Sequence, residues 1–169
     1  MNNIKRTESD VTKLIRLEQK SLFRYACYKT GNYEDAQDIL QNVFLKLYSD
    51  IKKLSLIENL PNYLYRSVSN ECISYYRKKI NINFISLDEA LNISEENRSD
   101  FMEDVARINR ILTFIPEEQA EVIRLRTICD KSFTEISQIL DVPVTTIKSR
   151  FKYGIDKIRN EFFNPGKNQ

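Results

Sequence analysis

The sequence predicts an all-α fold of two small helical domains joined by a flexible acidic linker, the second domain containing a helix-turn-helix. Helix breakers are scarce, with 3 glycines and 4 prolines in 169 residues. Apolar residues recur at helical spacing along most of the chain. That pattern weakens between residues 80 and 106, where asparagine, serine and acids dominate and a short turn is expected at 87–91. We therefore expect domains at 1–79 and 107–169, with a linker at 80–106.

The first helix is expected to run from Ser9, a good N-cap residue, to about Thr30, where Gly31 can end it. Its core-facing stripe is Val11, Leu14, Ile15, Leu22, Phe23 and Ala26. Further on, Pro61 is well placed as the first residue of another helix, which reaches about Lys79.

Between them, Asn32 is expected to cap a helix over residues 34–51, followed by a loop over 52–60. At about 100° per residue, one broad face of this helix is apolar and requires a protein core. This face contains Ala36, Ile39, Leu40, Val43, Phe44, Leu47, Tyr48 and Ile51. Leu45 points the opposite way and is ringed by Asp38, Gln41 and Asn42, with Asp35 one turn nearer the start.

An apolar side chain surrounded by acidic and polar ones is typical of a docking surface for a basic partner, with Leu45 as its desolvated centre. Single exposed leucines are also common on ordinary protein surfaces. Helical geometry alone leaves both interpretations open.

In the second domain, helices are expected over about 104–113, 117–128, 133–140 and 144–162, with Pro116 and Pro143 marking starts. Ser132 and Glu135 form a capping box that opens the third of these helices, and Asp141 lies in a tight turn after it. The inward stripes are Phe133, Ile136, Ile139 and Leu140, then Ile147, Phe151, Ile155 and Ile158.

Two short helices joined by a tight turn, the second with a polar and basic outer side, predict a DNA-binding helix-turn-helix. Base-edge contacts are expected from Thr145, Thr146, Ser149 and Arg150, and phosphate contacts from Lys148 and Lys152. An αα-corner with a solvated basic face is the alternative.

The helix from Pro61 to Lys79 has a second unusual side, which carries Tyr63, Arg66, Ser67, Asn70, Ser74 and Arg77. Its core side carries Leu64, Val68, Cys72 and Tyr76. Aromatic rings interspersed with arginine and asparagine suit unpaired nucleotides, because bases stack on rings while cations follow the backbone. A solvated face with a partly covered tyrosine is the alternative.

Composition excludes several other classes of protein. The chain contains no histidine, and Cys27, Cys72 and Cys129 are far apart, so we expect no metal site, no cofactor and no enzyme activity. The cysteines are expected to be small buried hydrophobes. No apolar run reaches the roughly 20 residues that span a bilayer, and no secretory signal begins the chain, so no membrane insertion and a cytoplasmic location are expected.

Charge is unevenly distributed. Residues 1–79 carry 14 basic and 9 acidic side chains (+5), residues 80–106 carry 1 and 7 (−6), and residues 107–169 carry 11 and 8 (+3). Basic surface is the usual electrostatic footprint of nucleic-acid binding. The charge of the acidic linker is consistent with a solvated tether.

The run from Gly31 to Leu45 resembles the core-polymerase-binding segment of extracytoplasmic-function sigma factors, the two-domain promoter-specificity subunits of bacterial RNA polymerase. The resemblance implies contact with the clamp helices of the largest polymerase subunit by Asp35, Asp38, Gln41, Asn42 and Leu45. The family more often has glutamate at the position of Asn42. Residues 142–150 resemble the stretch that recognises the −35 promoter element in the same family.

Residues 63–71 resemble the family's −10 recognition helix, although tryptophan is usual at the position of Tyr63. That similarity implies −10 contacts by Tyr63, Arg66, Asn70 and Arg77. In the family, the preceding loop, here about 53–62, holds a flipped base of the melted strand.

The resemblance as a whole implies an alternative sigma factor that binds core RNA polymerase, duplex −35 DNA and melted −10 DNA, and an anti-sigma factor is a common partner in the family. A stand-alone helix-turn-helix regulator is the alternative function. A helical adaptor that binds only protein is a third.

Overall fold

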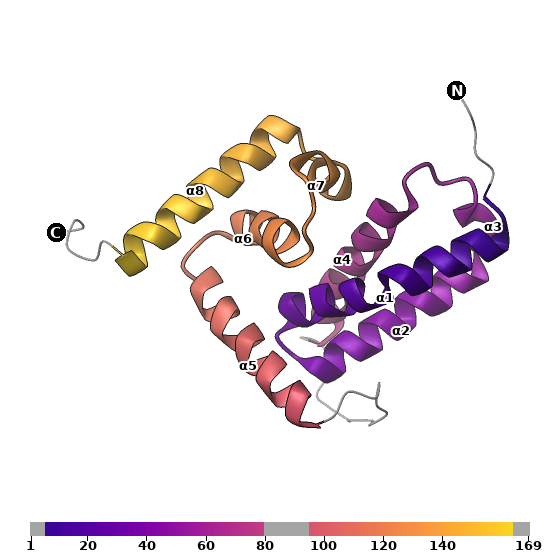
Figure 1. Ribbon diagram of the computed structural model, residues 1–169, viewed down its shortest axis with the longest axis horizontal. Coiled ribbons are helices and arrows are strands. Elements are labelled where there is room, and N and C mark those ends of the chain that lie inside the picture. Colours follow the sequence, from indigo (N-terminus) through magenta and orange to yellow (C-terminus); the bar gives the residue numbers. More distant parts are fainter. Residues whose placement is uncertain (1–5, 80–94, 164–169) are drawn as a thin grey trace. The chain divides into compact units, whose positions relative to one another are not determined.

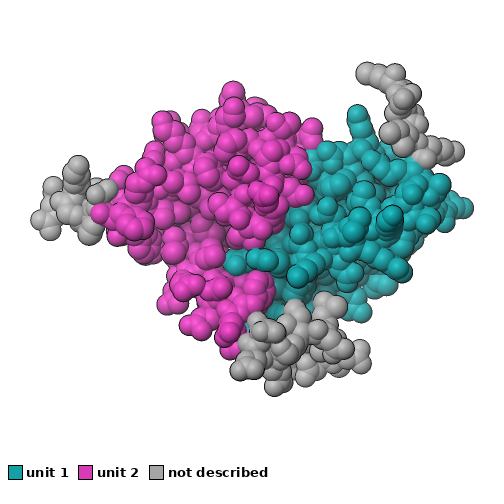
Figure 2. Space-filling view, viewed as in Figure 1, with its two compact units in different colours: residues 1–98 teal, residues 99–169 magenta. Residues whose placement is uncertain are grey.

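The computed structural model describes residues 6–79 and 95–163, which contain helices and no strand (Figure 1). The all-α fold class is therefore confirmed for the described part of the chain. The chain divides into two compact units, residues 1–98 and residues 99–169 (Figure 2). Within the described ranges, no helix has both the length and the apolar character that crossing a bilayer requires.

Unit 1 contains α1 (Glu8–Thr30), α2 (Tyr33–Ser49), α3 (Ile51–Leu54) and α4 (Leu60–Lys79). The sharp turn between α1 and α2 was predicted correctly. Gly31 has φ 68° and donates its backbone N–H to the carbonyl of Cys27, a left-handed conformation that glycine adopts without steric penalty. Asn32 then caps α2, because its side chain accepts the N–H of Asp35 at 2.9 Å.

The N-cap of α1 is Thr7, so the prediction of Ser9 was wrong. The Thr7 hydroxyl accepts the N–H of Asp10 at 3.2 Å, and the Asp10 carboxylate accepts the N–H of Thr7 at 3.0 Å. This reciprocal capping box satisfies two helix-end amides at once, whereas a cap at Ser9 would satisfy one. Hydrogen bonds from the Thr7 hydroxyl and amide lower the pKa of Asp10 below its ordinary value.

The core of unit 1 lies where α1, α2 and α4 pack together. Tyr25 and Tyr65 are fully buried with ring centroids 5.6 Å apart, and Phe23 meets Tyr33 edge to face at 5.0 Å. Aromatic pairs of this kind add about 0.5–1.5 kcal/mol beyond the burial of their surface. The predicted stripe of α1 is buried except for the half-buried Leu14.

Tyr48 is exposed, although the helical pattern assigned it to the core face of α2. By helical geometry it lies about 120° from the middle of the buried face, at the limit of what the core covers. The short helix α3 also occupies part of the region expected to be a loop, 52–60. Helix α4 begins at Leu60, one residue before Pro61, and the Asn59 side chain accepts the N–H of Asn62 at 3.2 Å.

Cys27 and Cys72 are buried and Cys129 is half-buried, consistent with the small apolar role predicted for them. Burial raises the pKa of the Cys27 thiol to about 12, so it stays protonated.

Unit 2 contains α5 (Glu95–Leu112, which begins in unit 1), α6 (Glu117–Ile123), η1 (Arg124–Ile128, one π-helical turn), α7 (Phe133–Leu140) and α8 (Val144–Phe163). Because α5 begins at Glu95, the prediction of a flexible linker to residue 106 was wrong from residue 95 onward. Apolar residues at helical spacing follow among the acids, with Val105 and Leu112 buried and Ile108 half-buried. Residues 80–94, including the turn expected at 87–91, lie outside the described residues.

The core of unit 2 is an aliphatic cluster supplied by α5, α6 and α8. It contains Leu112, Ile115, Ala120 and Ile123, packed against Ile108, Phe151, Ile155 and Ile158. Helix α8 passes close to α6 at Gly154, where an added Cβ would lie 2.9 Å from Cδ1 of Ile123. A larger residue there would force Ile123 to shift.

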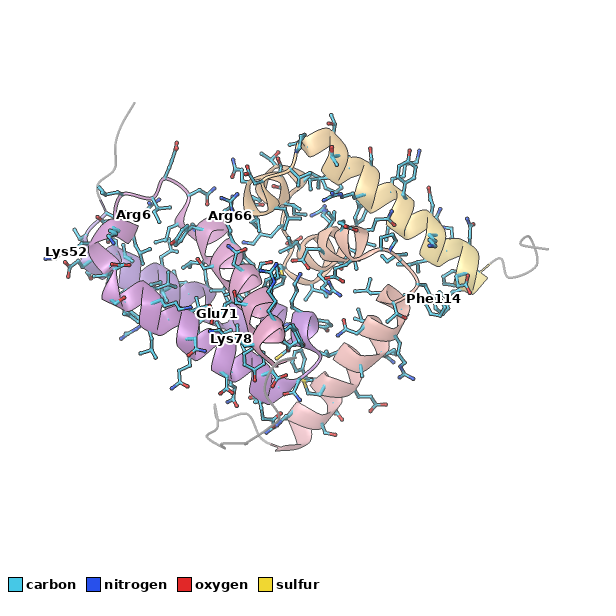
Figure 3. The ribbon with its side chains drawn as sticks, turned by 180° about the vertical axis from the view of Figure 1, so that it is seen from behind. Arg6, Lys52, Arg66, Glu71, Lys78 and Phe114 are labelled. Atoms are coloured by element: carbon cyan, nitrogen blue, oxygen red, sulfur yellow. The ribbon has the colours of Figure 1, made fainter. Side chains whose placement is uncertain are left out.

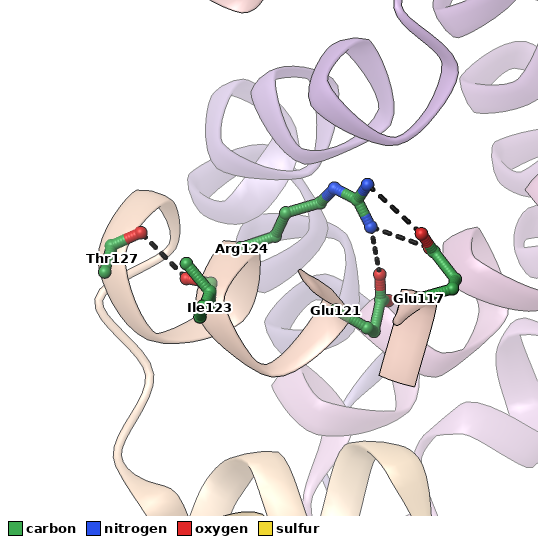
Figure 4. Close-up of polar contacts among 5 residues, drawn as sticks. All are labelled: Glu117, Glu121, Ile123, Arg124 and Thr127. Atoms are coloured by element: carbon green, nitrogen blue, oxygen red, sulfur yellow. Dashed lines mark hydrogen bonds and ion pairs between the residues drawn. The ribbon is translucent and has the colours of Figure 1, made fainter. Parts of the chain in front are cut away.

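Arg124 begins the π-helical turn and holds two acids of α6 (Figure 4). Its Nη1 atom lies 2.7 Å from Oε1 of Glu117 and 3.2 Å from Oε2 of Glu121. Burial disfavours the guanidinium cation, but the hydrogen bonds and charges of the two glutamates outweigh burial and raise the pKa of Arg124. The buried side chain thus stays charged and fixes the turn that leads into the helix-turn-helix.

Candidate functional site

The surface predicted on α2 is present, and we call its exposed members, Asp38, Gln41, Asn42 and Leu45, the Leu45 surface. The Leu45 side chain is 65% exposed, which confirms that it points away from the core. The buried side of the same helix carries Ala36, Ile39, Leu40, Val43 and Leu47. Leu45 therefore contributes little to the stability of unit 1 and leaves an apolar centre available for a partner.

Asp35 does not belong to the exposed surface, contrary to its predicted position on the wet side of α2. It is 8% exposed, and the Tyr75 hydroxyl of α4 donates a hydrogen bond to its Oδ1 at 3.0 Å. Asp35 precedes the buried Ile39 by one helical turn, so it lies at the edge of the core face. Burial, the hydrogen bond to Asp35 and the negative charge of Asp35 raise the pKa of Tyr75 to about 12.

Two further contacts bind α4 to its neighbours. Tyr76 donates its hydroxyl to the carbonyl of Thr30 at 2.6 Å, and Lys46 of α2 forms an ion pair with Glu71 at 2.6 Å. Figure 3 shows Glu71 on α4 between Arg66 and Lys78. The sequence analysis did not identify these contacts. The adjacent Tyr75 and Tyr76, next to the apolar stripe of α4, could have indicated such contacts, because a tyrosine hydroxyl that is buried requires a hydrogen-bond partner.

The −10 residues expected on α4 share one side of that helix. Tyr63, Asn70 and Arg77 are exposed, and Arg66 is half-buried. Arg6, the first described residue, contacts the loop before α4. It donates from Nη1 to the carbonyl of Ile57 at 2.6 Å and from Nη2 to the carbonyl of Glu58 at 3.1 Å.

The helix-turn-helix consists of α7, a short turn and α8. Ser132 and Glu135 form the predicted capping box. Asp141 has φ 57° and ψ 48°, the left-handed conformation that aspartate tolerates better than most residues. The Ser137 hydroxyl donates to the carbonyl of Val142 at 2.6 Å, so a side chain of α7 also closes the turn.

The residues expected to meet DNA lie in the first half of α8. Thr145, Lys148, Ser149 and Lys152 are exposed, and Thr146 and Arg150 are half-buried. Ser149 donates its hydroxyl to the carbonyl of Thr145 at 3.0 Å, within the helix. On the inner side, Phe151 packs against Phe133 of α7 with ring centroids 5.4 Å apart, which sets the angle at which α8 is presented.

Two family models match the chain. The model of Sigma-70 region 2 matches residues 14–80, and the model of Sigma-70, region 4 matches residues 112–160. The chain belongs to the sigma-70 family. Region 2 of this sigma factor carries the Leu45 surface and α4, and region 4 carries the helix-turn-helix.

Curated relatives narrow the class within the sigma-70 family. The chain is similar to the ECF RNA polymerase sigma factor SigW of Bacillus subtilis, with 28% identity over 149 residues and 80% of each chain covered. It is also similar to the RNA polymerase sigma factor SigV of the same organism, with 23% identity over 153 residues, 90% of this chain and 91% of the relative. The predicted class, an extracytoplasmic-function sigma factor, is thereby confirmed, and such a factor is not an enzyme.

Two solved structures share the fold. The sigma factor RpoE, in a co-crystal structure with the anti-sigma factor NepR from Bartonella quintana, has a TM-score of 0.65 and 18% identity, over 90% of this chain and 96% of that one. CnrH, solved in complex with the cytosolic domain of CnrY, has a TM-score of 0.69 and 17% identity, over 92% of this chain and 88% of that one.

The stability of region 4 in this sigma factor is expected to depend on pH through Glu135. Its carboxylate accepts the N–H of Ser132 at 2.8 Å, and hydrogen bonding from that amide lowers the pKa of Glu135. The stabilisation is therefore complete above the unfolded-state pKa and is lost as pH falls through the folded-state pKa. In urea unfolding, Glu135→Gln keeps an oxygen that can accept the Ser132 N–H but removes the charge, and it should cost about 0.3–1 kcal/mol at pH 7 and progressively less toward about pH 3. A difference that stays constant over this range would contradict the prediction.

Proposed function

We propose that this sigma factor binds core RNA polymerase through the Leu45 surface, reads duplex −35 DNA with α8 and holds melted −10 DNA with α4 and the loop before it. The observation that carries the proposal is the 65% exposure of Leu45 on a helix whose opposite side is buried. An apolar centre with a polar and acidic rim suits a basic partner surface. The buried Asp35 helps to position α2, which carries that surface, by accepting a hydrogen bond from Tyr75 of α4.

In region 4, the start of α8 enters the major groove with its first turns facing the bases. Thr145, Thr146, Ser149 and Arg150 are assigned to base edges, and Lys148 and Lys152 to phosphates. The packing of the Phe133 ring against the Phe151 ring supports this assignment, because it fixes α8 against α7.

In region 2, Tyr63 supplies a ring for base stacking, Asn70 a base-edge contact, and Arg66 and Arg77 cations for the backbone. Support comes from the shared exposed side of α4 and from the anchored loop, whose carbonyls at Ile57 and Glu58 are held by Arg6.

We also propose that the protein acts in the cytoplasm and that an anti-sigma factor restrains it. One structural relative was solved with an anti-sigma factor and the other with the cytosolic domain of a partner protein. A restraining partner of this kind would compete with polymerase if it covered the Leu45 surface.

The function as a whole is tested by run-off transcription from the promoter upstream of the chain's own gene. Core polymerase is assayed with and without the chain, and a transcript of defined length is expected only when the chain is present. Binding of the free chain to duplex DNA without any effect on polymerase would favour the stand-alone regulator instead.

Arg150 and Lys148 provide a matched pair for the assignments in α8. Arg150→Ala in the holoenzyme should relax preference at particular −35 bases, since a good base contact is worth about 1–3 kcal/mol. Lys148→Ala should instead weaken binding to all sequences alike and lower the salt slope by about 1. Binding of a panel of single-base promoter variants at several salt concentrations separates the two effects. A change of base preference without a change of slope for Lys148→Ala would contradict its assignment.

A further inference from the structure

The outer side of α1 carries a row of cations that no step above uses. Lys13, Arg16, Lys20 and Arg24 are all exposed and follow one another at spacings of three or four residues. Residues spaced in this way share one side of a helix. At 1.5 Å per residue the row extends for about 16 Å. We call these four residues the α1 basic row.

The first three cations of the row are not engaged by acidic side chains within the described part of the chain. Among the described residues, no ion pair involves Lys13, Arg16 or Lys20. Asp10 attracts Lys13, but its carboxylate already accepts hydrogen bonds from the N–H and hydroxyl of Thr7. Lys13, Arg16 and Lys20 therefore present three positive charges to solvent along one side of α1.

A shallow hollow lies at the first half of the row. It is lined by Ser9, Thr12, Lys13, Arg16 and Leu17. Two hydroxyls and two cations line it, and proteins use such groups to hold phosphate oxygens. Leu17, 73% exposed, is the apolar wall of this hollow.

The N-terminal end of α1, which carries the row from its second turn onward, contacts the loop assigned to the −10 element. Arg6, one residue before the N-cap of α1, holds the carbonyls of Ile57 and Glu58 in that loop. Figure 3 shows Arg6 at this end of unit 1. The N-terminal end of α1 and the loop assigned to the −10 element are therefore held together.

We propose that the α1 basic row binds the phosphate backbone of promoter DNA without sequence preference, extending the surface that begins at the −10 loop. This inference rests on the proposed function of unit 1. Charge complementarity favours nucleic acid over an acidic protein segment, because the cores of protein interfaces are depleted in charge, whereas this row has four cations and a single apolar residue.

The test compares two double variants as holoenzymes. Arg16→Gln with Lys20→Gln removes two charges from the row, and Arg110→Gln with Lys157→Gln removes the same types from exposed positions of unit 2. Promoter binding is measured between 50 and 200 mM salt. The row variant should bind about tenfold more weakly at low salt, with the salt slope reduced by about 0.7–0.9 per lost phosphate contact. The control variant should keep the wild-type slope.

Fully duplex and pre-opened promoters are measured in parallel, and a loss confined to either one supports the proposal and identifies the form of DNA that is bound. An unchanged slope on both overturns it. Leu17→Ser should leave promoter binding within twofold. If instead Leu17→Ser and the row variant both lose polymerase in the absence of DNA, the row binds an acidic protein surface and the proposal fails. A wild-type chain that forms no holoenzyme would overturn the proposed function itself, which is a distinct result.

Discussion

Leu45→Lys is expected to abolish co-purification of the chain with core RNA polymerase. The side chain is 65% exposed, so its replacement removes almost no core packing from unit 1. At a docked interface, loss of a central apolar anchor costs about 2–4 kcal/mol, a factor of roughly 30 to 1,000 in affinity. The new ammonium group would also face a basic partner, which adds repulsion to the lost contact.

The matched control for this change is Leu56→Lys, since Leu56 is 70% exposed and lies in the same unit. Both variants gain one charge and lose one exposed leucine, so both should unfold at the wild-type temperature by circular dichroism. Only Leu45→Lys should fail to be retained on a column that carries immobilised core polymerase. Retention of both variants would show that Leu45 is not the anchor.

Arg124→Leu is expected to cause the largest loss of stability of any single substitution considered for unit 2. The change removes the guanidinium that pairs with Glu121, a carboxylate that is only 5% exposed. Breaking a buried ion pair in this way typically costs about 3–5 kcal/mol. Glu117 is exposed and can be hydrated, so its loss of partner should matter far less. Urea unfolding of the full chain measures the effect.

The double variant Arg124→Leu with Glu121→Leu is the control for this mechanism. Replacing both members of a buried pair by apolar residues is often nearly neutral, so most of the lost stability should return. A double variant as unstable as Arg124→Leu alone would show that the arginine acts through packing of its stem and not through its charge.

The elements of the fold could be predicted where apolar spacing and caps agreed. Gly31 was expected to end the first helix and Asp141 to lie in a tight turn, and both have positive φ in the structure. The cap of α1 was missed because Thr7 and Ser9 are both good caps, and the choice depends on the carboxylate of Asp10. The start of α5 was missed because its acidic residues concealed a sparse apolar stripe.

The exposure of a candidate site residue could be predicted where it depends only on the position of that residue around its own helix. Leu45 is exposed because of its angle on α2, which the sequence contains. Asp35 is buried because Tyr75, forty residues later, meets it across the helix interface. No periodicity within α2 encodes that contact. The α1 basic row was equally visible as spacing, but its importance depends on Arg6 holding a loop more than fifty residues away.

The hydrogen bond and the ion pair between α2 and α4 restrict how these two helices can move relative to each other. Asp35 in the first turn of α2 is fastened to Tyr75, and Lys46 in its last turn is fastened to Glu71. These contacts lie near opposite ends of α2 and one helical turn apart on α4, so they resist rotation of α2 relative to α4. A displacement of α2 by a partner at the Leu45 surface would therefore also move α4, the helix proposed to hold melted DNA.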